Sequence, residues 1–205
     1  MDLTACVSHY IRHVQPHVHA EWAFYRRQPD LPAAIEIAAM CIGPNGRKHP
    51  HQYRIPQLAL ADAKVALLRC QNKIDKSSDF DNLHGIVASE FKDIPGLGKL
   101  TIYDTALRLG LYLRLEPQKV HLHAGALIGA RALGYEGDVI TRDQLPPPLA
   151  QLSAAEVEAF LCICKAQLLG EATLPTHCGA TGGLPICYPK TAASIEFAEA
   201  QPPLR

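Results

Sequence analysis

The sequence lacks an excess of charge of either sign. Its 20 Lys and Arg residues balance its 20 Asp and Glu residues, which gives a formal net charge of +0 at pH 7. A protein that binds nucleic acid through its overall charge is strongly basic, so this composition argues against that class of non-specific DNA-binding protein. It leaves room for a local basic patch, and any site for an anion must be built from a few neighbouring residues.

Long hydrophobic runs are also missing. No segment approaches the ~20 consecutive apolar residues that a membrane-spanning helix needs, and the N-terminal stretch has no apolar run of signal-peptide length. We therefore expect no membrane partner. The seven cysteines are an odd number and no secretory signal accompanies them. This favours reduced thiols in a cytoplasmic protein, associated with the nucleoid in a bacterium or nuclear in a eukaryote.

Alternating runs of β-branched residues, the pattern of half-buried strands, are nearly absent. The pattern that is present has a helical period. Phe80, Leu83, Val87 and Phe91 recur three and four residues apart and form one apolar face, and Ser78 or Asp79 can cap the start of this segment. The sequence therefore predicts an all-α protein that forms a single globular unit over residues 1–205.

Other helices are predicted from the same period and from their start signals. We expect helices in residues 1–27, 32–42 and 57–69, a helix after residue 98, and another that begins at Pro117 and runs through PQKVHLHAGALIGARALG. Ser153 and Glu156 form a capping box ahead of a helix that buries Phe160 and Leu161. Gly, Pro and Thr dominate from residue 170, so residues 170–205 are predicted to be irregular.

The strongest local signal is the corner PGLG (95–98), which joins two amphipathic segments. Glycine accepts positive φ, and without a Cβ it lets another backbone approach closely. The amides at the start of the helix after Gly98 lie at the positive end of its dipole and suit a phosphate oxygen, and Lys99 adds a charge nearby. Leu97 is expected to pack between the two helices. A helical corner with glycines for geometry alone is the alternative.

The segment FDNLHGIVASEFKDIPGLGKLTIYDTALRLG resembles the helix-hairpin-helix element of a superfamily of DNA glycosylases, whose core reads hydrophobic-Pro-Gly-hydrophobic-Gly-x-x-Thr. The resemblance covers roughly residues 30–135 and is specific at the hairpin (78–115). It implies a two-lobed helical fold that binds double-stranded DNA and flips one damaged or modified base into the cleft between the lobes. It also implies phosphate contacts by the hairpin residues Gly96, Leu97, Gly98, Lys99 and Thr101.

Family members that also cut the DNA strand carry a lysine two residues after the second hairpin glycine. Leu100 occupies that place here, and Lys99 is one residue early, which turns it about 100° around the helix. The resemblance therefore implies a monofunctional glycosylase, with Leu100 and Tyr103 at the base pocket. The late cysteines do not have the compact spacing of the iron–sulfur cluster that some members bind, so we expect no cofactor; they are Cys162, Cys164, Cys178 and Cys187.

The family's catalytic aspartate should occur near the start of the following helix, but no carboxylate is present between Glu116 and Glu136. His121 and His123 stand in that region and are able to orient water or protonate a departing base. Asp104 lies one turn after Leu100 on the same helical face, which lines the base pocket in the resembled family. The candidate catalytic residues are therefore Asp104, His123 and His121, with packing or solvent exposure as the alternative for each.

The loop GRKHPHQYR (46–54) gathers basic residues in a chain without net charge. Arg47, Lys48 and Arg54, together with Tyr53, form a compact cationic and aromatic cluster. We interpret it as a DNA-facing loop, with a solvated surface loop as the alternative.

Two other functions stay open at this point. One is a catalytically inactive DNA-binding module built on the same hairpin. The other is a metal-dependent protein that uses His9, His13 and His17, which are spaced four residues apart. Pro16 interrupts that helix and few further ligands are near, so we predict no metal site. No obligate protein partner is evident.

Overall fold

The structure is a computed structural model that describes residues 2–173. Its architecture is helical, which confirms the all-α expectation. The helices are α1 (Leu3–His13), α2 (Gln15–Arg26), α3 (Leu31–Ala39), α4 (Gln57–Arg69), α5 (Gln71–Asp75), α6 (Phe80–Phe91), α7 (Lys99–Leu113), α8 (Ala124–Ala132), α9 (Pro147–Ala150), α10 (Ala154–Ile163) and α11 (Lys165–Leu168). Two short strands, β1 (Val120–His121) and β2 (Val139–Ile140), and two 3-10 turns, η1 (Pro50–Gln52) and η2 (Arg142–Gln144), complete them.

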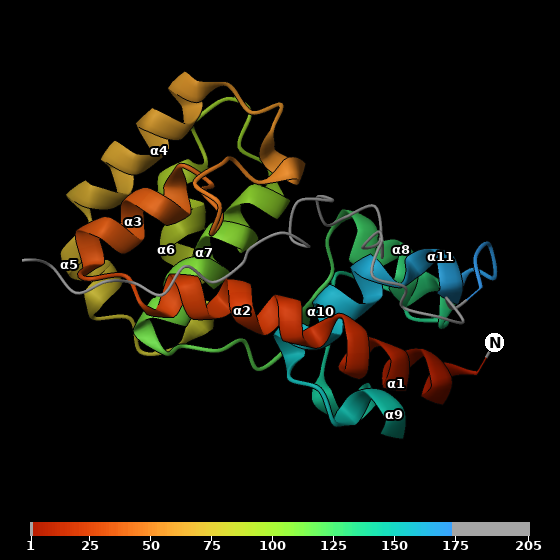
Figure 1. Ribbon diagram of the computed structural model, residues 1–205. Coiled ribbons are helices and arrows are strands. Elements are labelled where there is room, and N and C mark those ends of the chain that lie inside the picture. The colour runs from red at the N-terminus through yellow and green to blue at the C-terminus, as the bar shows by residue number, and fades with distance from the viewer. Residues whose placement is uncertain (1, 174–205) are drawn as a thin grey trace, which may run out of the picture.

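The helices α3 to α7 follow one another in the chain and pack around one hydrophobic core, which we call the contiguous lobe (Figure 1). Phe80, Leu83, Val87 and Phe91 of α6 are all buried in it. The apolar face predicted from the sequence is therefore the face that α6 turns toward its neighbours. Burial of each such side chain contributes roughly 1.5–3 kcal/mol, which gives this lobe a core of its own.

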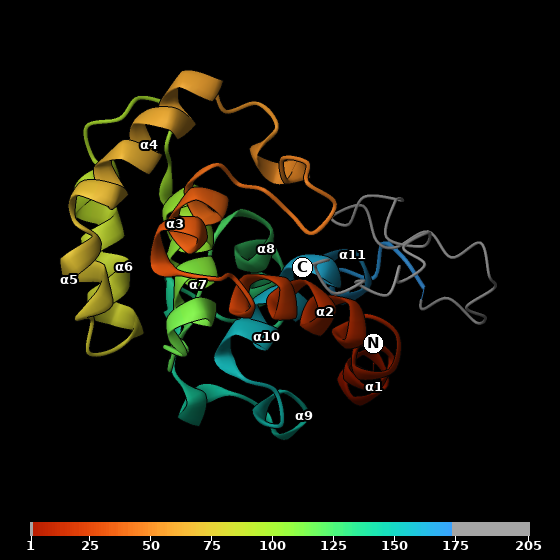
Figure 2. The same cartoon turned by 60° about the vertical axis from the view of Figure 1, so that its left-hand side comes forward.

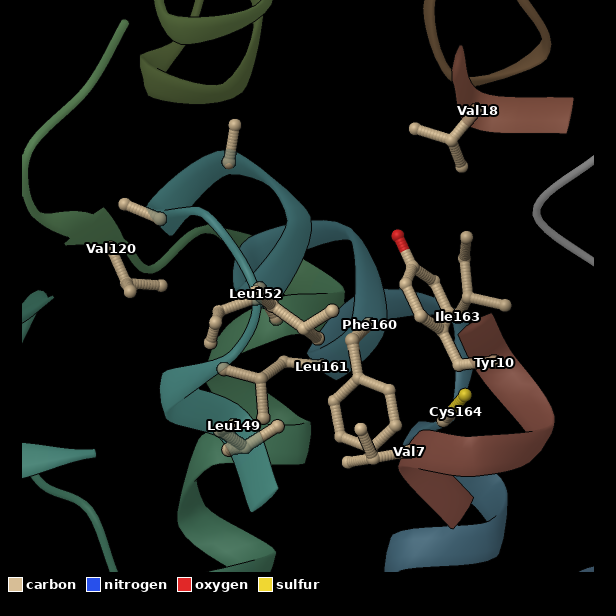
Figure 3. Close-up of a cluster of buried hydrophobic side chains, with 14 of the residues drawn as sticks. Val7, Tyr10, Val18, Val120, Leu149, Leu152, Phe160, Leu161, Ile163 and Cys164 are labelled. Carbon is tan, nitrogen blue, oxygen red and sulfur yellow. The ribbon is translucent and has the colours of Figure 1, made fainter. Parts of the chain in front are cut away.

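A second core combines the start of the chain with residues 120–168, and we call it the composite lobe. The ring of Tyr10 on α1 meets Phe160 on α10 edge to face, with centroids 5.5 Å apart (Figure 3). Helices α8 and α10 approach very closely at Gly129, where a Cβ would overlap the carbonyl group of Leu161. The composite lobe therefore depends on contacts between residues far apart in the sequence.

Helices α2 and α7 connect the two lobes. In Figure 1, α2 runs along both groups of helices, and Figure 2 shows the same two groups from another side. Val18 and Trp22 of α2 are buried in the composite core, while the same helix packs against α7. Leu107 of α7 lies against both cores. These two helices therefore fix how the lobes face one another.

Helices α6 and α7 flank the PGLG corner. Asp79 caps α6 and accepts a hydrogen bond from the backbone N–H of Asn82 at 2.8 Å. Gly96 has φ +90°, a conformation that side chains with a Cβ rarely adopt. Gly98 is the N-cap of α7 and supplies no side-chain acceptor to its first amides. The two packed helices thus fall within residues 78–115, and their contact with DNA stays a prediction.

Three predicted helices have different bounds in the structure. The helix expected over residues 32–42 is Leu31–Ala39, and Cys41 beyond it has a left-handed backbone. The helix expected over residues 1–27 is broken at Val14, because Pro16 in the first turn of α2 has no N–H to continue the bonding of α1. The helix expected from Pro117 begins only at Ala124. Residues 120–121 pair instead with residues 139–140, and this pairing buries Val120 in the composite core. Tertiary contacts here override helical propensity.

The start of α10 is as predicted. Ser153 and Glu156 form the capping box, with the Ser153 backbone N–H donating to Glu156 Oε2 at 2.7 Å. Phe160 and Leu161 are buried, which confirms the predicted apolar stripe. The segment predicted to be irregular, residues 170–205, lies mainly outside the described residues. Among the helices of residues 2–173, none is long and apolar enough to cross a membrane.

Candidate active site between the two lobes

A cleft of about 470 Å³ opens between the lobes. Its walls come from α2, the loop before η1 and η1 itself, α7, α8, α10 and the start of α11. Part of the lining is polar and includes Glu21, His49, Asp104 and Arg108. The rest is mainly apolar and includes Val18, Trp22, Leu100, Leu107, Ile128 and Ile163. The cleft therefore offers both charged and apolar side chains to a molecule that enters it.

Asp104 projects into this cleft from α7, one turn after Leu100, as the helical spacing predicts. The amide nitrogen of Gln52 donates to Asp104 Oδ2 at 2.5 Å, and Arg108 Nη2 lies 3.9 Å from the same oxygen. The side chain of Asp104 is 20% exposed. Burial raises the pKa of this carboxyl group, and the nearby Arg108 charge opposes that shift only in part.

Gln52 and Arg108 contact the carboxylate of Asp104 and are themselves held in place. Arg108 Nη2 donates to the side-chain oxygen of Gln52 at 2.9 Å, and Arg108 Nη1 donates to the carbonyl oxygen of Ala38 at 3.5 Å. The guanidinium group also lies 5.7 Å from the ring centroid of Tyr25. Gln52 and Arg108 are 1% and 6% exposed, so both are fixed by packing as well as by hydrogen bonds. Asp104 therefore has a defined orientation.

A second carboxylate lies in the same cleft. Glu21 of α2 places Oε1 2.6 Å from His49 Nε2, and each side chain is 16% exposed. The loop that carries His49 is held by a hydrogen bond from the His49 backbone N–H to the Cys41 carbonyl oxygen at 2.8 Å. Cys41 itself has φ 57°, a strained conformation for a residue other than glycine. The backbone is thus bent at the point where the chain turns toward the cleft.

The hairpin corner and the basic loop meet at one surface. Pro56 would be 3.6 Å from a Cβ at Gly96, so the end of the loop touches the corner. Arg47 and Arg54 are exposed on this loop, whereas Lys48 donates to the Ile55 carbonyl oxygen at 3.0 Å. The loop also carries Tyr53, whose side chain is 77% exposed.

The other hairpin residues have different degrees of exposure. Lys99 is 83% exposed and lies 3.3 Å from Asp138, an ion pair too exposed to hold it firmly. Leu97 packs against the contiguous core, as predicted. Thr101 is 6% exposed, so its side chain supports the corner from inside. Lys99 is thus exposed at this corner, whereas the side chain of Thr101, which was predicted to contact DNA, is buried and this expectation is corrected.

The two candidate histidines lie next to each other, with ring centroids 6.3 Å apart, but only His123 lines the cleft. His123 is the N-cap of α8 and lines the cleft together with Asp104. Burial, reinforced by the neighbouring His121 and His84, lowers the pKa of His123 to about 4, so it is uncharged at neutral pH. His121 belongs to β1 and packs among the rings of Phe80, His84 and Tyr103. Its environment is that of a core residue.

Tyr103 does not have the position expected of it. Its side chain is fully buried in the contiguous core, with centroid distances of 5.9 Å to Phe80 and 4.7 Å to His123. Tyr103 precedes Asp104 by one residue and therefore lies about 100° away from it around the helix, outside the cleft lining. The aromatic residues of α2 that line the cleft are Trp22 and Tyr25. The expectation that Tyr103 borders the pocket is therefore corrected.

The structure thus brings together Asp104, Leu100 and His123 from the predicted set. Sequence reasoning missed four residues around them. Arg108 could have been found, since it stands one turn after Asp104 on the same helix face. Glu21, His49 and Gln52 come from segments far from Asp104 in the chain, and no local pattern connects them.

The possibilities for a metal are limited in the described part of the chain. Within residues 2–173, no three His, Cys, Asp or Glu side chains are grouped so that they could hold a metal ion. His9 and His13 do pack ring to ring, at 4.7 Å between centroids. Cys178 and Cys187 lie outside the described residues.

Comparison with models of protein families, with curated proteins and with solved structures found no match.

Proposed function

We propose that the protein is a monofunctional DNA glycosylase, which hydrolyses the N-glycosidic bond of a damaged or modified base flipped out of double-stranded DNA. The observation that carries this proposal is the position of Asp104. It presents a carboxylate to an interlobe cleft from the helix that begins at the PGLG corner. One helix thus connects the surface suited to a phosphate with the pocket suited to a base.

The size and lining of the cleft support a nucleobase as its occupant. A volume of about 470 Å³ lies within the range of small-molecule sites. Trp22 and Leu100 offer apolar surfaces to the faces of a base, while Asp104 and Arg108 offer polar groups to its edge. Enzymes that act on a base within a duplex take it out of the stack into such a pocket.

Asp104 has the chemistry that the reaction needs. When the bond between C1′ and the base nitrogen breaks, its electron pair leaves with the base and positive charge develops on the sugar. A nearby carboxylate stabilises this charge and accepts a proton from the attacking water. Burial raises the pKa of Asp104, which makes the carboxylate a better base, and Gln52 keeps one of its oxygens in place.

The surface beside the cleft supports DNA as the carrier of the base. The amides at the start of α7, Lys99, and the exposed Arg47 and Arg54 form a patch that can contact phosphates. A neutral chain needs such a local patch, because it has no overall attraction for nucleic acid. A DNA substrate would place the protein in the cytoplasm or nucleoid of a bacterium or in a nucleus.

The proposal is tested by incubating the protein with duplex oligonucleotides that each carry one altered base. Abasic sites are then converted to strand breaks with alkali. We expect breaks for at least one base, and only after alkali treatment. Breaks before alkali treatment would show lyase activity and contradict a monofunctional reaction. Binding without base release from any duplex would instead favour the inactive DNA-binding module.

Replacing Asp104 tests its role directly. Asp104→Asn keeps the shape of the side chain and removes its charge, so we expect base release to fall by about 10²–10⁴-fold while duplex affinity stays within a few fold. Single-turnover kinetics and a binding titration measure the two effects. Asp62→Asn on the exposed face of α4 is the matched control. Unchanged release by Asp104→Asn would remove this residue from the mechanism.

A further inference from the structure

Glu21 and His49 form a hydrogen-bonded pair that has no part in the role proposed for Asp104. Both side chains line the cleft that Asp104 lines, but they reach it from α2 and from the loop before η1. Glu21 Oε1 and His49 Nε2 are 2.6 Å apart, which makes a short hydrogen bond between the two side chains. The cleft therefore contains a second carboxyl group, hydrogen-bonded separately from Asp104.

The surroundings hold this pair in one geometry. His49 Nδ1 is buried and makes no hydrogen bond, so Glu21 is the partner that fixes the ring through Nε2. The hydroxyl group of Tyr25 donates to the Ile42 carbonyl oxygen at 3.2 Å and lies 3.5 Å from Glu21 Oε1. Each member of the pair keeps 16% of its side chain exposed. A molecule in the cleft can therefore contact the Glu21–His49 pair, although the surrounding protein fixes the geometry of the pair.

We infer that Glu21 donates a proton to the departing base, and that His49 is the positioning residue that keeps this proton on the pair. This inference rests on the proposed glycosylase function and adds a second carboxylate to it. A neutral base is a poor leaving group unless a nitrogen or oxygen of the ring is protonated, because otherwise it departs as an anion. A positively charged base needs no such proton.

The step balances in the following way. The proton shared by Glu21 and His49 moves to the base as the C1′–N bond breaks, and the electron pair of that bond stays on the base. The oxygen of water forms the new bond to C1′, and its proton passes to Asp104. Release of the products lets Asp104 lose this proton and the Glu21–His49 pair regain one from solvent. No oxidant or reductant is involved.

The charge of the base provides the test. Duplexes carrying hypoxanthine, a neutral base, and 7-methylguanine, a cationic base, are compared in single turnovers with excess protein. For Glu21→Gln we expect release of hypoxanthine to fall by about 10²-fold or more and release of 7-methylguanine to change by less than about 3-fold. Glu36→Gln is the matched control, since Glu36 pairs with Lys64 on the surface of α3 and is 54% exposed.

A second variant separates chemistry from folding. His49→Asn should reduce release of hypoxanthine in the same direction and by a smaller factor, because Glu21 keeps its carboxyl group but loses the partner that positions the proton. Melting temperatures of both variants are measured alongside. A purely structural role for the pair would slow release of the two bases equally, so the difference between them is the decisive readout.

The outcomes distinguish this inference from the proposed function. Equal losses for both bases in Glu21→Gln, or release of only the cationic base by the unaltered protein, overturn the role of Glu21 and leave the glycosylase in place. If only hypoxanthine is released, a loss below about tenfold in Glu21→Gln overturns it too. Release of neither base nor any other altered base by the unaltered protein overturns the function and the inference together.

Discussion

The two lobes are built from helices of similar kind but in different ways. The contiguous lobe takes its core from helices that follow one another along residues 31–113. The composite lobe joins α1 and α2 to residues 120–168, and hydrogen bonds to Glu156 from Gln15 and His19, each of 2.7 Å, tie these segments together. The first lobe can thus be completed by neighbours in the chain, whereas the second requires the chain to return to its beginning.

The largest difference between the lobes is expected when one buried aromatic side chain is removed from the core of each. Phe160→Ala and Phe91→Ala should each cost about 3–5 kcal/mol of stability. Amide hydrogen exchange should show the difference. Phe160→Ala is expected to lower protection in α1 as well as in α8 and α10, because Phe160 contacts Tyr10. Phe91→Ala should lower protection within α3 to α7 first. Equal loss over the whole chain in both variants would contradict two separable cores.

A smaller effect is expected where helices touch most closely. Gly129→Ala inserts a Cβ against the backbone of Leu161, and we expect a loss of about 1–3 kcal/mol in urea unfolding. Gly85→Ala is the matched control in the contiguous lobe. Gly85 lies within α6 with nothing near its Cβ position, so this change should stabilise by roughly 0.5–1 kcal/mol. Changes of the same sign would refute the tight α8–α10 contact.

The smallest effect concerns the rings that lie where the lobes meet. His84 of α6 packs against His121 of β1, and burial lowers the pKa of both, as it lowers that of His123 to about 4. The unfolded chain therefore binds more protons below pH 6.5 than the folded protein does. Stability should fall by about 1–2 kcal/mol as the pH drops from 6.5 towards 4.

Replacing one of these histidines measures how much it contributes to the pH dependence of stability. His121→Phe keeps an aromatic ring beside Phe80 and Tyr103 but cannot take up a proton, so the melting temperature should fall less steeply below pH 6.5. Asp81, 3.7 Å from His121, and Lys119, which pairs with Asp81, remain in place. His17→Asn, at an exposed position of α2, is the control. An unchanged pH slope in His121→Phe would contradict the assignment.

The contrast between the lobes also explains how far the sequence could predict this protein. Helix α4 has the predicted bounds, and the caps of α6 and α10 are those expected, because each depends on residues within one turn. The contiguous lobe follows from such local patterns. Residues 117–123 were predicted wrongly as helix, because residues 120–121 pair with residues 139–140, a contact that no local pattern reveals.

The candidate site could likewise be predicted only where its residues lie close together in the sequence. Asp104 was predicted because it lies on the same helix face as Leu100, and Gly96 because its corner has a recognisable sequence. The Glu21–His49 pair joins side chains 28 residues apart, and Gln52 and Asp104 are 52 residues apart. Such pairs become visible only once α2, the loop and α7 are placed in space.

The hydrogen bond between Gln15 and Glu156 has a consequence for how the protein is made. The two residues are 141 positions apart. At about 5–20 residues per second, a ribosome needs roughly 7–28 s to add the second after the first. The contiguous lobe is complete well before that time, while α1 waits with Cys6, Val7 and Tyr10 uncovered. Until residues 120–168 have been synthesised, these side chains lack the partners that bury them in the folded protein, and a chaperone would be expected to bind this segment.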